Sequence, residues 1–130
     1  MYKREFMYKR DYRLYIDDII EATNKIEKYV ERLSFDEFSE DSKIIDATVR
    51  NFEIIGEATK NIPQKIRKKY PDIPWKKMAR MRDKLIHEYF GVNKEVLWKT
   101  IKEDLPKVKP GIKRVLKKMN EEVKRYTQFH

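Results

Sequence analysis

The sequence predicts an all-α fold, a single helical bundle of about five to six helices over residues 1–130. Apolar residues recur every three or four positions along most of the chain, proline and glycine stand at the ends of those stretches, and no stretch alternates like a β-strand. No run rich in glycine or serine divides the chain, so one domain is expected. Charged residues make up 41% of the sequence, so each helix needs a strongly charged outer face.

The first long helix is predicted over residues 9–33, with residues 1–8 as a flexible N-terminal extension. Its apolar positions alternate by four and three, which places them on one straight stripe. Ser34 with Glu37 three residues later matches a capping box, so a short helical turn should follow. The inner stripe comprises Tyr12, Ile16, Ile19, Thr23, Ile26, Val30 and Leu33.

The second long helix is predicted over residues 42–61, because Asp41 or Ser42 can cap it and Pro63 must end it. A short helix over residues 63–69 follows, and Pro71 ends it. The inner stripe of the long helix comprises Ile45, Thr48, Phe52, Ile55, Thr59 and Ile62.

A further amphipathic helix is predicted over residues 74–90, with proline in its first turn and Gly91 just past its end. This helix carries Arg82, His87 and Tyr89, so the rest of the chain is interpreted around it. Its apolar stripe comprises Trp75, Met78, Leu85, Ile86, Tyr89 and Phe90.

Two helices are predicted in the C-terminal part of the chain. Asn93 should cap the first, over residues 94–104, and the second should run over residues 110–126. Pro106 and Pro110 should bracket a basic turn between them, because proline interrupts a helix.

Composition excludes several classes of protein. The chain has no cysteine, which excludes disulfides and cysteine zinc sites, and only His87 and His130 could serve as histidine ligands. No metal site or cofactor is therefore expected. No run approaches 18 apolar residues and no signal-peptide segment opens the chain, so we expect a cytoplasmic protein without a membrane partner.

The net charge of +9 is unevenly distributed. Residues 17–57 hold five basic and twelve acidic side chains, a net −7, whereas residues 60–84 hold ten basic and two acidic ones, a net +8. Residues 99–125 add ten basic and four acidic side chains, a net +6. Basic zones of this size attract polyanions such as nucleic acids, although a solvated lysine-rich face would look the same. The acidic segment could equally bind a basic protein.

Arg82 and His87 together are typical of phosphodiester chemistry. Arginine presents a permanently charged fork that matches a phosphate, and histidine can give or take a proton near neutral pH. On an ideal helix the two side chains point about 140° apart, whereas Arg82 and Tyr89 nearly superimpose. A groove between two copies of the chain would supply both residue types twice, which favours a homodimer. The same three residues also suit a purely structural role, with Arg82 in a surface ion pair, His87 at the rim and Tyr89 in the core.

Several blocks resemble one known family. Residues 73–75 and 81–93 resemble the signature block of the HepT family in the HEPN superfamily, whose motif is R-x4-H-x-Y. Residues 50–58 resemble the family's second-helix block, and residues 96–101 with 104–106 resemble its downstream block. The similarity spans nearly the whole chain from Met7.

The resemblance implies a homodimeric toxin ribonuclease that cleaves RNA without metal and pairs with an MNT-type minimal nucleotidyltransferase antitoxin. By position, Arg82 and His87 would be catalytic, and Tyr89 would receive AMP from the antitoxin. Arg80 departs from the family pattern, which expects a small residue two places before the motif arginine. The expected RNA-binding residues are Lys76, Lys77, Arg80 and Lys84.

Two alternatives stay open. A non-catalytic HEPN-like module would bind nucleotides or RNA through the basic groove without needing His87. A helical assembly partner would need neither the basic groove nor His87. A ribonuclease predicts metal-independent cleavage that is lost with His87, whereas a binding module predicts salt-sensitive affinity alone.

Overall fold

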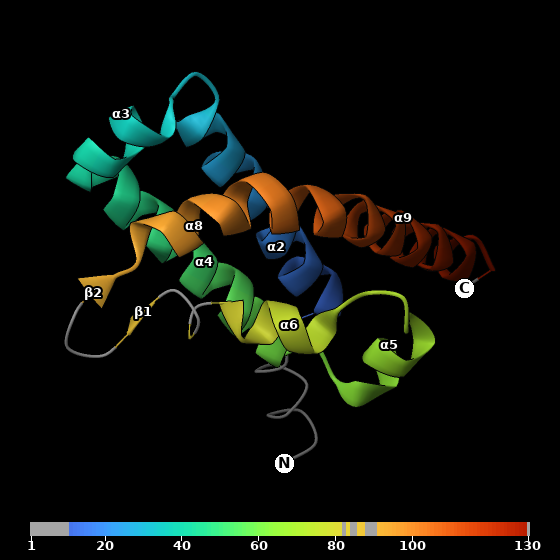
Figure 1. The fold of residues 1–130 in the computed structure, drawn as a ribbon. Helices are drawn as coiled ribbons and strands as arrows, with labels where there is room; N and C mark the ends of the chain where they lie inside the picture. The colour runs from blue at the N-terminus through green and yellow to red at the C-terminus, as the bar shows by residue number, and fades with distance from the viewer. Residues whose placement is uncertain (1–10, 82, 84–85, 88–90, 130) are drawn as a thin grey trace, which may run out of the picture.

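A computed structural model of the chain describes residues 11–81, 83, 86–87 and 91–129, and for residues 86–87 and 128–129 it describes the backbone alone. The extension expected over residues 1–8 lies outside this range. The described residues form an almost wholly helical structure, as predicted (Figure 1). None of the helices in this part of the chain combines the length and the apolar character that crossing a membrane requires.

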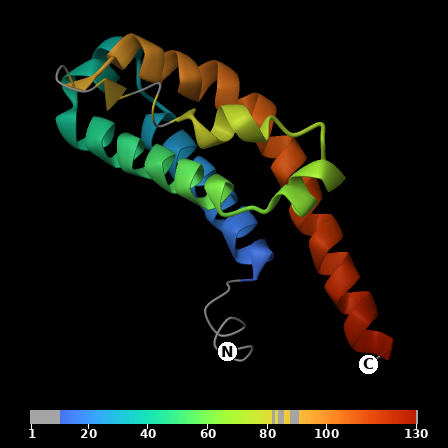
Figure 2. The same ribbon diagram turned by 90° about the horizontal axis from the view of Figure 1, so that it is seen from below.

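Two long helices, α2 (Tyr12–Val30) and α4 (Ser42–Lys60), run side by side in opposite directions (Figures 1 and 2). The short helix α3 (Phe35–Glu40) joins them. It begins with the predicted capping box: the backbone N–H of Glu37 donates to Ser34 Oγ at 3.1 Å, and Glu37 Oε1 accepts from the N–H of Ser34 at 3.0 Å. The inner stripes predicted for both long helices are largely buried.

The C-terminal end of α4 is held by the short helix that follows it, α5 (Gln64–Lys69). The guanidinium of Arg67 donates to the backbone oxygens of Thr59 (2.7 Å) and Ile62 (3.0 Å). A cation in this position satisfies carbonyls that have no helical partner and complements the helix dipole. The chain then turns back, and the indole N–H of Trp75 donates to the oxygen of Tyr70 at 2.9 Å.

The prediction of one continuous helix over residues 74–90 is wrong. Helix α6 (Trp75–Ala79) ends at Arg80, and two short strands, β1 (Ile86–His87) and β2 (Gly91–Val92), pair antiparallel. The expectation that no strand occurs is therefore also corrected. The hairpin suits its residues, because Ile86 is β-branched and Gly91 has a φ of +75°, which favours glycine. Proline lies just before α6, at the N-cap.

The predicted break around Pro106 and Pro110 is also wrong. After α8 (Lys94–Lys99), which Asn93 caps as predicted, a π-helical segment η1 (Thr100–Asp104) leads directly into α9 (Leu105–Phe129). The backbone N–H of Leu105 donates to the oxygen of Thr100, five residues earlier. This wider turn places Pro106 in the first turn of α9, where its missing N–H costs little.

Helix α9 bends and then extends beyond the α2–α4 pair (Figure 2). Pro110 lies inside α9 and cannot donate to the carbonyl four residues earlier, which accounts for a bend. Helix α9 packs against α2 as far as Asn120, whose Oδ1 accepts from Arg13, whereas Val123 beyond it is exposed.

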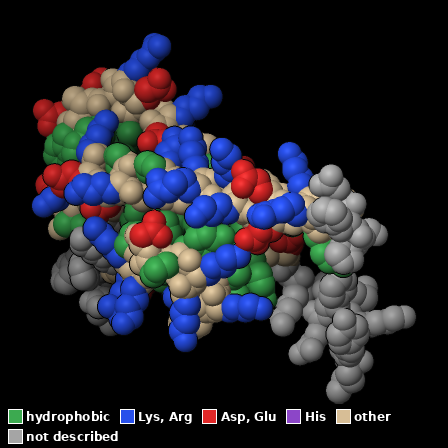
Figure 3. All heavy atoms as spheres, turned by 90° about the vertical axis from the view of Figure 1, so that its right-hand side faces the viewer, with side chains coloured by type: hydrophobic (Ala, Val, Ile, Leu, Met, Phe, Trp, Pro, Cys, Tyr) green, Lys and Arg blue, Asp and Glu red, His purple; other side chains and the backbone are tan. Residues whose placement is uncertain are grey.

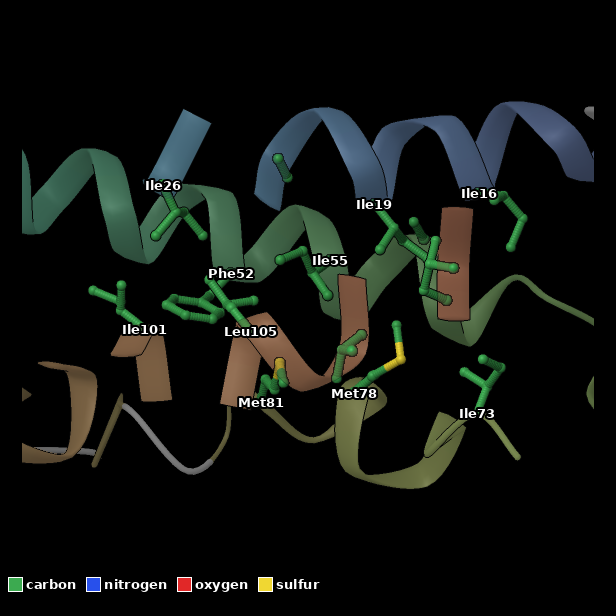
Figure 4. Close-up of a cluster of buried hydrophobic side chains, with 14 of the residues drawn as sticks. Ile16, Ile19, Ile26, Phe52, Ile55, Ile73, Met78, Met81, Ile101 and Leu105 are labelled. Atoms are coloured by element: carbon green, nitrogen blue, oxygen red, sulfur yellow. The ribbon is translucent and has the colours of Figure 1, made fainter. Parts of the chain in front are cut away.

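The core lies where α2, α4, α6 and α9 meet (Figure 4). Met78 of α6 and Met81 just after it point into this core together with Leu105 at the start of α9. The segment that carries the sequence motif is thus anchored at its beginning by two buried methionines. The largest fully buried side chains are Phe38, Phe52, Ile16, Ile19, Ile26, Ile55, Ile62, Met78, Leu97, Leu105 and Ile112.

Candidate functional site

A pocket of about 480 Å³ opens beside the end of α6, where the motif segment begins. One wall comes from α6 and the residues after it, and the other comes from the π-helical segment η1. Segments about 20 residues apart in the sequence therefore form one site. The lining residues are Lys77, Arg80, Met81, Asp83, Thr100 and Asp104.

Both walls are fixed by contacts to the core. Met81 is 3% exposed and holds the first wall, and Thr100 is 3% exposed and holds the second. The Thr100 hydroxyl donates to the oxygen of Val96 at 2.8 Å, so its hydrogen is already used within the helix. Lys77 Nζ lies 3.2 Å from Asp104 Oδ1 and joins the two walls.

The described pocket lining carries charges of both signs. Lys77 is paired with Asp104, whose side chain is only 16% exposed, whereas Arg80 is exposed and forms no ion pair with any residue that the structure describes. Asp83 supplies a second carboxylate. The lining therefore has no net positive charge, and Arg80 is its cation best able to hold a phosphate, because no described carboxylate engages its guanidinium fork.

The structure brings together two of the residues predicted to form the site, Lys77 and Arg80. Lys76 is exposed on α6 but does not line the pocket. Arg82, Lys84 and Tyr89 lie outside the described residues. His87 is described only by its backbone, which forms strand β1.

The strand at His87 corrects the helical geometry predicted for the motif. A separation of about 140° between Arg82 and His87, and the superposition of Arg82 with Tyr89, both require one continuous helix. Because β1 pairs with β2 instead, His87 is on the hairpin rather than on α6. Spacing along one helix therefore no longer decides how the motif residues approach one another.

Sequence reasoning missed the second wall of the pocket. Thr100 and Asp104 were not expected at the site, and neither was Asp83. A usable signal was present for both residues of this wall, because Thr100 and Asp104 belong to the downstream block that resembles the family. π-Helical turns often occur at functional sites, but nothing in the residues of this segment predicts one.

The part of the chain that the structure describes contains no group of three or more His, Cys, Asp or Glu side chains arranged to hold a metal ion. Asp83 and Asp104 are the two carboxylates of the pocket lining.

Comparison with known proteins gives a consistent result. Residues 19–115 match the family model described as "Ribonuclease HepT-like". The chain is 50% identical over 109 residues to a "Probable ribonuclease HepT" of Thermococcus cleftensis, which covers 84% of this chain and 99% of the relative. It is 43% identical over 111 residues to a putative RNase of Methanocaldococcus jannaschii, covering 85% of this chain and 92% of that one.

A putative RNase of Caldanaerobacter subterraneus is 43% identical over 106 residues, which span 82% of this chain and 95% of the relative. No solved structure matches the chain significantly. The matched residues include both walls of the pocket and most of the buried core. The chain therefore belongs to the HepT-like ribonuclease family.

Proposed function

We propose that this protein is the toxin ribonuclease of a toxin–antitoxin pair and that it cleaves RNA without a metal ion in a cleft shared by two copies of the chain. Arg82 and His87 are the catalytic residues of this proposal. An MNT-type nucleotidyltransferase is the antitoxin, and it silences the toxin by adding AMP to Tyr89. RNA as the substrate follows from the family.

The proposed reaction needs only proton transfer and charge stabilisation. A neutral His87 removes the proton of the ribose 2′-OH, and that oxygen attacks the adjacent phosphorus while the bond to the 5′ oxygen breaks. A protonated histidine from the second copy gives its proton to the departing 5′ oxygen. Arg82 balances the negative charge that develops on the phosphate oxygens. The products are a cyclic phosphate and a free 5′-OH.

One observation carries this proposal: in a chain of the ribonuclease family, the R-x4-H-x-Y motif begins directly after Met81, a residue that lines the pocket. Met81 is buried, so the chain enters the motif from a fixed point. Arg80 on the same wall adds an exposed guanidinium to that of the motif. A site with this composition suits an anionic substrate that reacts through acid–base chemistry.

The first experiment measures RNA cleavage with EDTA present. We expect His87→Ala and Arg82→Ala each to lower the rate about 10²-fold or more, with unchanged helix content. His130→Ala is the matched control, because it removes the other histidine of the chain. Arg32→Ala, which removes an exposed arginine just after α2, is the control for charge. Equal cleavage by wild type and His87→Ala would refute the assignment and point to a contaminating nuclease or a different site.

The shared cleft has its own test. The proposed reaction needs a histidine from each copy, so a mixed dimer of one wild-type and one His87→Ala chain has only one of the two histidines. If the two copies share one site, we expect the activity per wild-type chain to fall as His87→Ala chains are added. An activity per wild-type chain that stays constant would show that each chain works alone. Sedimentation that shows only a monomer of 16.0 kDa at micromolar concentration would contradict the shared cleft.

Silencing by AMP is tested by intact-mass spectrometry. With ATP and magnesium, the cognate nucleotidyltransferase should add one or more units of about 329 Da to the wild type. Each unit brings a bulky anionic group two residues from His87, so RNA phosphate should be repelled. Tyr89→Phe should gain no mass and stay active. A Tyr89→Phe protein that gains the same mass, or a modified wild type that still cleaves, would refute this part of the proposal.

A further inference from the structure

A row of contacts continues from the pocket along α9. Lys77 pairs with Asp104, Asp72 lies 3.5 Å from Arg114, and Lys69 lies 2.6 Å from Glu122. Residue numbers fall along the α5–α6 side while they rise along α9, so the two segments run antiparallel. From Asp104 to Glu122 the row covers about 27 Å of helix at 1.5 Å per residue.

Exposed cations line this row on both sides. On α9 the positions 107, 114, 118 and 125 are separated by seven or four residues, so they share one face of the helix. Figure 3 looks at this side of the molecule and shows many lysine and arginine side chains with carboxylates between them. We name this surface the basic seam, and its cations are Lys69, Lys76, Lys107, Arg114, Lys118 and Arg125.

The carboxylates beside the seam do not neutralise it. Asp72 and Glu122 pair with Arg114 and Lys69, but the four side chains are 46–65% exposed, and such pairs contribute at most about 1 kcal/mol. A phosphate can therefore compete for both cations. The other four seam cations form no ion pair with any residue in the described part of the chain. The seam is net positive, in contrast to the pocket lining.

This contrast has a consequence for substrate binding. The described lining of the pocket holds two cations and two carboxylates and cannot by itself attract a polyanion strongly. A row of cations spaced along a helix, rather than a compact patch, matches a polymer with evenly spaced charges. A stacked strand has a phosphate about every 3.4 Å, so roughly eight phosphates would span the seam.

We propose that the basic seam binds the phosphates of the RNA substrate beyond the position of cleavage, so that the enzyme selects RNA strands long enough to reach from the pocket along α9. This inference rests on the proposed function, because it takes RNA as the substrate. Contacts of this kind read phosphates rather than bases, so they favour length without favouring a sequence.

The test compares two triple variants of equal charge. Arg114→Gln, Lys118→Gln and Arg125→Gln remove three seam cations, and Lys25→Gln, Lys28→Gln and Lys43→Gln remove three exposed cations from α2 and α4. Binding is measured in the His87→Ala background, where the RNA is not cleaved, with a tetranucleotide and with a 20-nucleotide RNA. Cleavage of the same RNAs is measured with His87 present.

For the 20-nucleotide RNA, the seam triple should lose at least about tenfold in affinity near 100 mM salt, and its salt slope should fall by about two. The control triple should lose much less. The tetranucleotide should bind the seam triple and the wild type alike, and kcat at saturating RNA should not change. Because Arg125 is exposed near the C-terminal end of α9, Arg125→Gln alone keeps the test valid if the triple variant does not fold.

Equal losses in the two triple variants would show a general effect of net charge and would overturn the proposal. An unchanged RNA affinity of the seam triple would also overturn the proposal. In that case, a changed sedimentation coefficient or the loss of binding to an acidic protein would identify the seam as a protein interface. Failure of the proposed function would look different, because RNA cleavage would be absent from the wild type while the binding comparison could still be made.

Discussion

The close approach of α9 to the loop before α6 can be tested at Gly111, which lies in α9 opposite Ile73. A Cβ atom added at Gly111 would lie 2.5 Å from Ile73 Cδ1, well inside the contact distance of two carbon atoms. Ile73 is only 6% exposed, so its terminal methyl has little free space to move into. Gly111 is buried within a helix, where glycine is otherwise unfavourable.

Two opposing effects determine the result of Gly111→Ala. Alanine should gain about 1 kcal/mol from helix propensity, whereas forcing a methyl against Ile73 should cost about 1–3 kcal/mol. We expect a net destabilisation of about 1 kcal/mol. Ile73→Val removes the clashing Cδ1 and should cost about 0.5–1.5 kcal/mol alone. In that background Gly111→Ala should become stabilising by about 0.5–1 kcal/mol.

Urea unfolding followed by circular dichroism gives the four free energies of unfolding for a double-mutant cycle. Protein concentration must be the same for all four chains, because dimerisation would couple stability to concentration. For a chain of this length, 1 kcal/mol also corresponds to a shift in Tm of roughly 3–6 °C. The coupling free energy between the two positions should be at least about 1 kcal/mol.

A zero coupling free energy would refute the reasoning. If Gly111→Ala raised stability equally in the wild-type and Ile73→Val backgrounds, α9 would not approach the loop as closely as described, and only helix propensity would act. Val115→Ala is a control for packing, because Val115 is also buried on α9, one helical turn beyond Gly111. The same close approach aligns the two sides of the basic seam. The double-mutant cycle therefore also tests the helix arrangement on which the proposal of RNA binding by the seam depends.

Three further predictions concern charge, pH and a buried hydrogen bond. Lys76→Gln should weaken RNA binding more than Lys77→Gln, because Lys77 is already paired with Asp104; filter binding at several salt concentrations compares them. The pKa of Glu37 is lowered, chiefly because it accepts the backbone N–H of Ser34, so its stabilisation is present above about pH 4.5 and is lost as pH falls through the folded-state pKa. The urea midpoints of wild type and Glu37→Gln should accordingly differ at pH 7 and converge in acid, and a constant difference would contradict the capping role. Trp75→Phe should cost about 1 kcal/mol in urea unfolding beyond any packing change, because the carbonyl of Tyr70 loses the indole donor but keeps the N–H of Ile73.

Local signals predicted the helices before α6 and the start of α8 well. The signals that worked each act within four residues of their own position, so they can be recognised in the sequence alone. They are the capping box at Ser34, the caps at Asp41 and Asn93, and the stop at Pro63. The long stripes of α2 and α4 needed only the helical period. Such elements can be predicted because one local rule determines each of them.

The segment after α6 could not be predicted in the same way. Gly91 fits the position after a helix, but its positive φ fits the start of a hairpin strand equally well. The pairing of Ile86 with Val92 and of His87 with Gly91 joins residues across the turn, and periodicity within one helix cannot show it. For the candidate site, sequence reasoning therefore found the motif and the cations Lys77 and Arg80 but not the second wall.

The second wall of the pocket depends on the π-helical segment η1. This segment explains why the wall was not predicted and why α9 continues through Pro106 without a break. The buried residues Leu97, Ile101 and Leu105 follow one another at intervals of four residues. On a regular α-helix two such intervals exceed two full turns by about 80°, so Leu105 would point about 80° away from Leu97. After Leu105 the intervals between successive buried hydrophobic residues alternate between three and four residues. The wider turn over Thr100–Asp104 takes up the rotation and keeps all three residues on the core side. The same turn sets Thr100 and Asp104 at the pocket and provides for Pro106, so the packing of α8 against the core, rather than any residue preference, creates this part of the site.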